Sequence, residues 1–279
     1  EAALDSVGSL GTASDAETAG GQLDVTGATS YEFKSGTNGT GSNGTLTLNS
    51  DGSYSYTLTS PMDSGAIDGA NVVNNVETFS YTATDANGNT VDGTITVDIK
   101  DDVPTAKADT DSVAEGATAT GNVFTGTETT GDTNTTDGTA DTKSADTTTV
   151  VGVRADGTPA DTTTAVDTGL TTTIAGNYGT LTMAADGSYT YESTEDAVTT
   201  PGAQDVFVYT IKDADGDLST TTLTIDVTDT TLVADNDDIQ VDEAALETVG
   251  SNPTSTDETA GGTLAVAGTD VTYAFKTGE

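Results

Sequence analysis

The sequence DGSYSYTLTS at residues 51–60 returns, little changed, as DGSYTYESTE at residues 186–195. In both copies an Asp-Gly pair precedes two tyrosines that alternate with small polar residues. Asp-Gly tolerates the positive φ of a tight hairpin turn, and alternation places both tyrosines of a pair on one face of a strand. The stretch therefore predicts a core hairpin that the chain uses twice. Its aromatic residues are Tyr54, Tyr56, Tyr189 and Tyr191.

Similarity continues on both sides of the hairpin. The segment ETFSYTATDANGNTVDGTITVDI (77–99) corresponds to DVFVYTIKDADGDLSTTTLTIDV (205–227) at a spacing of 128 residues. A longer repeat begins with EAALDSVG (1–8), which returns as EAALETVG (243–250) at a spacing of 242. Internal repeats of this kind indicate an array of similar units.

The repeats divide the chain into three units. We expect one unit at residues 1–102 with its N-terminal strand cut short, a second at 103–230, and the incomplete start of a third at 231–279. The second contains a Thr/Asp-rich insertion at 125–149, which we interpret as a long loop or an extra edge hairpin. We expect the third unit to be frayed, because it lacks the aromatic hairpin. The missing initiator Met suggests an excerpt from a longer chain.

Strand patterns dominate the two larger units. Apolar and polar residues alternate in runs such as Ile95, Val97 and Ile99, which is typical of half-buried antiparallel strands. Turn signals recur between short strands, and no helical period persists beyond a single turn predicted at DEAAL (242–246). The expected fold is all-β, with tandem immunoglobulin-like or cadherin-like β-sandwich domains in an extended array.

The chain is strongly acidic. It contains 46 Asp and Glu against 7 Lys and Arg, a formal net charge of −39, and neither Cys nor His. So few cations argue against binding to nucleic acid or to an anionic membrane surface. The missing residue types exclude disulfides, thiol chemistry and histidine catalysis. Two interpretations remain: a disordered chain, or a fold whose carboxylates bind Ca²⁺. The alternating aromatics favour the fold.

Acidic residues gather at the two unit boundaries. The first boundary contains Asp98, Asp101, Asp102, Asp109, Asp111 and Glu115. The second contains Asp226, Asp229, Asp235, Asp237, Asp238, Asp242 and Glu243. Calcium takes six to eight oxygen ligands, and a boundary can supply them from both neighbouring domains. We therefore predict Ca²⁺ sites at these boundaries; the alternative is a solvated acidic linker.

A second acidic pattern occurs in the loop DADGD. Asp213, Asp215 and Asp217 could present three carboxylates from one turn, and the counterpart DANGN (85–89) forms a weaker set. The spacing is similar to the start of an EF-hand loop, but no Glu follows at the twelfth position. The alternative is an ordinary hairpin turn without metal.

Several of these motifs resemble a known family. DGSYSYT, ETFSYTATDANGNT and ADTDSVAEGATATGNVF are similar to repeats of giant bacterial type I-secreted RTX adhesins, including the VCBS and cadherin-like repeat families. The segment EAALDSVGS…ETAGG resembles a second repeat type of the same adhesins. The resemblance implies extracellular, calcium-dependent extender domains that project a distal adhesive tip from the bacterial cell surface.

The expected function is a calcium-stiffened spacer without enzymatic activity, partnered by neighbouring repeats of the same long chain. The main alternative is a subunit of an extracellular filament or sheath in which like chains pack together. A carbohydrate-binding module would need exposed tyrosines, whereas alternation places them in the core. We expect no membrane insertion, because no apolar run approaches about 18 residues.

Overall fold

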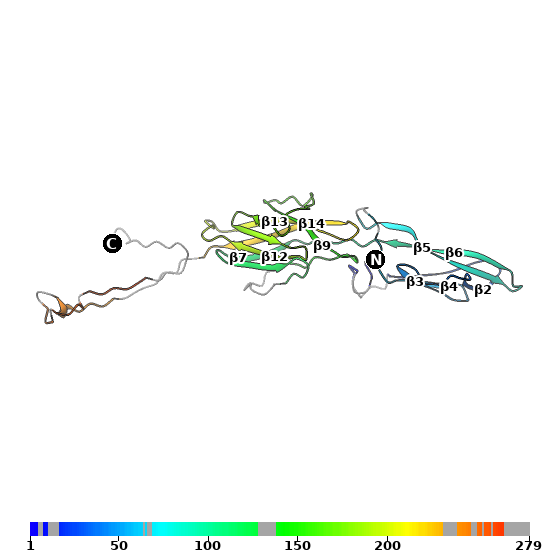
Figure 1. Ribbon diagram of the computed structural model, residues 1–279, viewed down its shortest axis with the longest axis horizontal. Helices are drawn as coiled ribbons and strands as arrows, with labels where there is room; N and C mark the ends of the chain where they lie inside the picture. Colours follow the sequence, from blue (N-terminus) through cyan, green and yellow to red (C-terminus); the bar gives the residue numbers. More distant parts are fainter. Residues whose placement is uncertain are drawn as a thin grey trace.

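The computed structural model describes residues 1–4, 8–10, 17–63, 65, 69–127, 138–230, 239–246, 250–252, 254–257 and 259–264. Apart from one short 3-10 turn, η2 (Glu243–Ala245), the regular structure of these residues is β-strand. The expected all-β fold is therefore confirmed, and so is the single turn at DEAAL. Strands β1–β14 form two pairs of sheets, which lie end to end in an elongated molecule (Figure 1).

The first sandwich contains two three-stranded sheets. One has the order β1 (Thr18–Gln22), β4 (Ser53–Leu58), β3 (Gly44–Leu48). The other has the order β2 (Ala28–Phe33), β5 (Val72–Asp85), β6 (Thr90–Lys100). All pairs within these sheets are antiparallel.

The second sandwich contains two four-stranded sheets. One has the order β10 (Ile174–Ala175), β11 (Gly179–Met183), β12 (Ser188–Ser193), β8 (Thr118–Asn122). The other has the order β7 (Asp109–Ala114), β14 (Leu218–Thr228), β13 (Ala203–Lys212), β9 (Thr149–Asp156). Strand β7 pairs in parallel with β14, and the other pairs are antiparallel. The predicted unit boundaries near residues 102 and 230 stay predictions.

The aromatic hairpins form the centre of each core. Tyr191 is fully buried against Phe207, and Tyr56 lies against Phe79 in the same way. Tyr189 is also buried, while Tyr54 is partly buried at the edge of its core. This places the tyrosines where the alternation predicted. The hairpin glycines have φ values of 86° and 85°, as Asp-Gly turns require.

Glycine is required opposite the first tyrosine of each hairpin. Gly21 pairs with Tyr54, and Gly121 pairs with Tyr189. In both pairs the tyrosine ring and hydroxyl cover the glycine so closely that a Cβ atom would overlap them. The same device therefore fixes the register of β1 on β4 and of β8 on β12.

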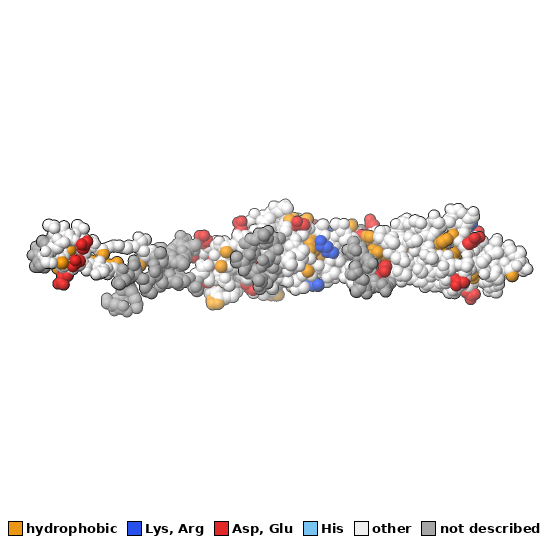
Figure 2. Space-filling model, turned by 90° about the horizontal axis from the view of Figure 1, so that it is seen from below, with side chains coloured by type: hydrophobic (Ala, Val, Ile, Leu, Met, Phe, Trp, Pro, Cys, Tyr) orange, Lys and Arg blue, Asp and Glu red, His pale blue; other side chains and the backbone are white. Residues whose placement is uncertain are grey.

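The N-terminal segment lies between the two sandwiches (Figure 1). Leu4 is 3% exposed and packs into the core of the first sandwich, together with Ala145 from the segment that precedes β9. Ala145 belongs to the predicted insertion, whose described part makes an isolated bridge between Thr105 and Thr142. The insertion thus contributes to the contact between the sandwiches. Acidic side chains are scattered along the molecule, and few basic ones accompany them (Figure 2).

Candidate metal centre at the junction

Two segments that the sequence suggested as separate metal sites meet where the sandwiches join. Asp101 follows β6 directly, and the loop that connects β13 to β14 contains Asp215 and Asp217. Carboxylate oxygens of these three residues lie within 4.8 Å of one another, and the residues are 2%, 7% and 2% exposed. The fold thus combines a linker carboxylate of one sandwich with loop carboxylates of the other.

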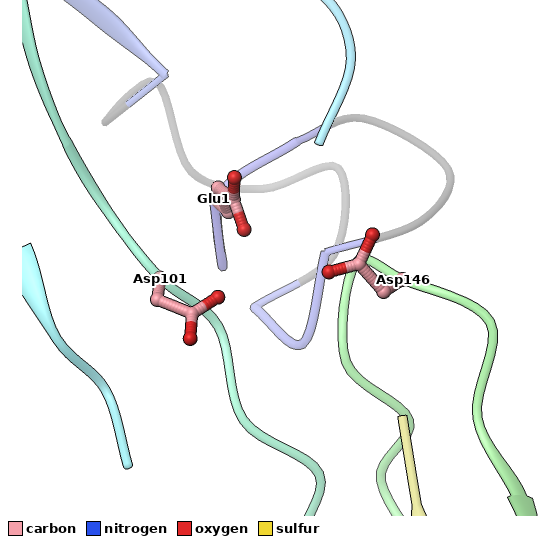
Figure 3. A group of neighbouring side chains, drawn as sticks. All are labelled: Glu1, Asp101 and Asp146. Atoms are coloured by element: carbon pink, nitrogen blue, oxygen red, sulfur yellow. The ribbon is translucent and has the colours of Figure 1, made fainter. Parts of the chain in front are cut away.

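A second, overlapping group contains residues that sequence reasoning missed. Oxygens of Glu1, Asp101 and Asp146 also lie within 4.8 Å of one another, and their side chains point toward a common space (Figure 3). A signal for Glu1 is present in the long repeat, where Glu1 is equivalent to Glu243, a residue predicted to bind metal at the second boundary. Asp146 has no such signal, because it lies in the segment interpreted as an insertion.

Burial makes this concentration of negative charge costly. It raises the pKa of Asp213 to about 7, and the Asp215 carboxylate adds to the rise. It raises the pKa of Glu1 to about 8, and that of Asp146 to about 6, where the carboxylates of Asp215, Asp63 and Asp102 contribute further. A divalent cation bound here would offset both the desolvation cost of the charged carboxylates and their mutual repulsion.

The donor atoms fit a hard cation. Asp213 is 4% exposed, and its Oδ1 accepts hydrogen bonds from the backbone N–H groups of Gly216 and Asp217. Its Oδ2 makes no hydrogen bond within the described residues, and the same is true of Glu1 Oε2 and Asp146 Oδ2. Buried oxygens of this kind normally have a partner. Oxygen-only ligand sets suit Ca²⁺, which takes six to eight oxygens.

Asp102 has a different role beside this centre. It accepts hydrogen bonds from the backbone N–H groups of Ser9 and Ala145, each at 2.8 Å, and from the Ser9 hydroxyl. It therefore connects the N-terminal segment, the linker and the second sandwich. Asp98 lies on the exposed face of β6 and accepts the backbone N–H of Asn75 at 2.8 Å.

The remaining predicted residues of the first boundary point into the second sandwich. Asp109 accepts the Tyr209 hydroxyl at 2.7 Å, and Asp111 accepts the Tyr189 hydroxyl at 2.8 Å. Glu115 accepts the backbone N–H of Val198. These carboxylates are 1%, 0% and 8% exposed. Their hydrogen-bond donors belong to their own sandwich, and among the described residues neither carboxylate group that contains Asp101 includes them.

At the second boundary the structure shows no comparable gathering among the described residues. Asp226 is half-buried and accepts from the Gln204 side chain, and Asp229 is exposed. Asp242 caps η2, and Glu243 is its exposed first residue. Asp235, Asp237 and Asp238 lie outside the described residues, as does most of the unit that we expected to be frayed.

The weaker DANGN loop is an ordinary turn. Asp85 is half-buried and accepts hydrogen bonds from the backbone N–H groups of Asn87 and Asn89, both at 2.8 Å. Such turns need no ion. The comparison shows what distinguishes the DADGD loop: the same turn geometry is buried against carboxylates of another segment.

Comparison with known proteins supports this architecture. Residues 2–98 match the family model of a bacterial Ig domain. Domains of this family are typical of extracellular surface proteins and of surface or adhesion-type structural modules. The match covers the first sandwich. No curated protein matches the chain.

Solved structures show distant likeness only. Cadherin domains 3–6 of protocadherin gamma B2 are 10% identical with a TM-score of 0.29, covering 72% of this chain and 43% of that one. An endo-fucoidan hydrolase of glycoside hydrolase family 107 is 16% identical with a TM-score of 0.24, covering 77% and 26%. The eight N-terminal Ig domains of Down syndrome cell adhesion molecule are 10% identical with a TM-score of 0.24, covering 76% and 25%. The chain thus spans less than half of these proteins.

The described part of the chain contains no helix that is long and apolar enough to cross a bilayer.

Proposed function

We propose that this chain is a calcium-stiffened extender segment of a large bacterial cell-surface adhesin of the type I-secreted class. Its sandwiches would act as spacers in a rod that carries a distal adhesive region for attachment and biofilm formation. They would bind neighbouring repeats of the same chain and catalyse no reaction. The observation that carries the proposal is the buried group formed by Asp101 from one sandwich and Asp215 and Asp217 from the other.

The mechanism follows from where these ligands originate. Asp101 and Glu1 belong to the first sandwich and its N-terminal segment, whereas Asp146, Asp215 and Asp217 belong to the second. An ion shared by both sets is bound completely only when the two sandwiches are aligned. Binding therefore favours one relative orientation over all others, which converts a joint into a rigid connection. Without the ion, mutual repulsion among the carboxylates favours separation.

The test is thermal unfolding and small-angle scattering of the whole chain in millimolar Ca²⁺ and in excess chelator. Calcium should raise the melting temperature by mass action and narrow the distribution of shapes toward the extended form. The structure offers a matched pair of variants, because Asp213 and Asp85 hold equivalent hairpin turns in the two sandwiches. Asp213→Asn and Asp85→Asn remove similar turn interactions, but only Asp213→Asn should reduce the effect of calcium. The proposal would be refuted if calcium affected both variants equally, or if calcium had no effect on the unmodified chain.

A further inference from the structure

The sequence contains three Asn-Gly pairs, at residues 38–39, 43–44 and 87–88. In such a pair the glycine nitrogen can attack the side-chain amide carbon of the asparagine, because glycine has no Cβ atom to hinder the approach. Ammonia leaves and a five-membered succinimide forms. Water then opens the ring at either carbonyl, which restores the proton of the glycine nitrogen and gives an aspartyl or an isoaspartyl linkage. Water is therefore the only co-reactant that the conversion needs.

The fold holds the pair at residues 43–44 in place. The Asn43 carbonyl accepts the backbone N–H of Thr59 at 2.8 Å, and the Asn43 side-chain amide donates to Pro61 O at 2.8 Å. Tyr56 lies so close to Gly44 that a Cβ atom there would overlap its ring. These contacts prevent the rotation that would bring Gly44 N onto the Asn43 side-chain amide carbon.

The pair at residues 38–39 is exposed but anchored. Asn38 Oδ1 accepts the backbone N–H of Thr40 at 2.8 Å, and Gly39 O accepts the backbone N–H of Leu46 at 2.7 Å. The side-chain amide must leave the first of these bonds before it can react. We therefore expect this pair to react more slowly than an unanchored one.

The pair at residues 87–88 lies in the DANGN loop, at the end of the first sandwich away from the second (Figure 1). Asn87 and Gly88 are exposed, and within the described residues no backbone N–H donates to the Asn87 carbonyl. Gly88 has a φ of 84°, and nothing lies within 4 Å of the position that a Cβ atom would occupy. The backbone hydrogen bond that the attack must break runs from Gly88 N to Asp85 O at 3.1 Å.

We propose that Asn87 is a modification site, at which the Asn87-Gly88 linkage converts spontaneously to aspartyl and isoaspartyl forms. The local sequence supplies the reactive pair, and the fold leaves this pair free while it restrains the other two. The bonds that restrain Asn43 belong to the folded state, so local opening must precede any reaction there.

The aspartyl product makes the loop more similar to its repeat equivalent. Asn87 corresponds to Asp215, so DANGN becomes DADGN, beside DADGD at residues 213–217. Asp215 belongs to the group of carboxylates at the junction. Conversion would thus give the first sandwich a further oxygen ligand for a hard cation, at the same position of its turn. This consequence rests on the proposed calcium function, whereas the conversion itself does not.

Mass spectrometry of proteolytic peptides tests the proposal on the full chain incubated at pH 9. Each converted asparagine gains the mass difference between a carboxamide and a carboxyl group, and fragment ions show which residue has changed. Asn87 should convert at least about tenfold faster than Asn43, because Asn43 must first open locally, and it should also convert faster than Asn38. No conversion at Asn87, or equal rates at Asn43 and Asn87, would overturn the proposal.

The same incubation in urea separates the effect of the fold from that of the local sequence. The three pairs have small neighbours, in TNGT, SNGT and ANGN, so their rates should become similar in the unfolded chain. A preference for Asn87 that persists in urea would overturn the structural argument. Asn87→Gln should remove the fast conversion and leave the other two rates unchanged, since a longer side chain closes a less favourable ring.

Calorimetry of calcium binding separates the conversion from its consequence. Asn87→Asp represents the aspartyl product and Asn87→Gln the unconverted loop, and Asn87→Asp should bind Ca²⁺ more tightly. Equal binding by the two variants would refute the consequence for metal binding, while the mass measurement still decides whether the conversion occurs.

Discussion

Replacing Asp141 with Asn should stabilise the second sandwich at pH 8 but not at pH 4. The Tyr209 hydroxyl lies 2.7 Å from Asp109 Oδ2 and 3.0 Å from Asp141 Oδ2, and Tyr209 is fully buried. One hydroxyl proton can serve only one of these acceptors. The second contact is favourable only if the other carboxyl is itself protonated. If both carboxylates are ionised, one carboxylate oxygen lies against the Tyr209 hydroxyl oxygen with no proton between them, and this contact is repulsive.

The pKa shifts of Asp109 and Asp141 determine the size of the expected stabilisation. Burial raises the pKa of Asp141 from 3.8 to about 7, with a contribution from the Asp109 carboxylate, and raises that of Asp109 to about 6. The folded state therefore holds protons that the unfolded state has released, and stability falls as pH rises from about 4 to 7. For Asp141 this loss is at most about 4 kcal/mol, at about 1.4 kcal/mol per pKa unit.

The carboxamide introduced by Asp141→Asn can still accept from Lys107 N and donate to the Tyr209 hydroxyl, without the charge. Allowing for relaxation, we expect a gain of about 2 kcal/mol at pH 8, or about 8 °C in melting temperature. Urea unfolding at pH 4, 6 and 8 measures the gain. Asp186→Asn is the control, because hydrogen bonds from Ser188 lower the pKa of Asp186 and reverse the expected slope. Equal effects of Asp141→Asn at pH 4 and 8 would refute the reasoning.

Other predictions concern packing in the two cores. Tyr209→Phe should destabilise the second sandwich by about 2 kcal/mol or more at pH 8, because two buried carboxylates lose their shared donor, and chemical denaturation at pH 8 measures this loss. Gly121→Ala should cost about 1–3 kcal/mol in urea unfolding because its Cβ would overlap Tyr189, whereas Gly157→Ala meets nothing within 4 Å and should be nearly neutral. Leu46→Ala should cost about 2–5 kcal/mol, but Leu218→Ala, which is 43% exposed, should change the melting temperature little.

Local pattern and repetition were sufficient to predict much of the fold. Alternation placed Tyr56 and Tyr191 in the cores, and the Asp-Gly pairs predicted both hairpin turns. These features depend on residues close in sequence, so they survive without knowledge of tertiary structure. The parallel pairing of β7 with β14 brings together segments more than 100 residues apart, and no local period specifies it.

The candidate metal centre was harder to predict from the sequence, because it too depends on segments that are far apart in the chain. The sequence identified Asp101 and the DADGD loop, but their convergence depends on how two sandwiches meet. It also grouped Asp109 and Asp111 with them, since all are acidic residues near one boundary. Acidity alone cannot distinguish a ligand from a carboxylate held by a tyrosine hydroxyl. The deciding information is a tyrosine distant in sequence: Tyr209, two strands away in the same sheet, donates to Asp109, and Tyr189, in the opposite sheet, donates to Asp111.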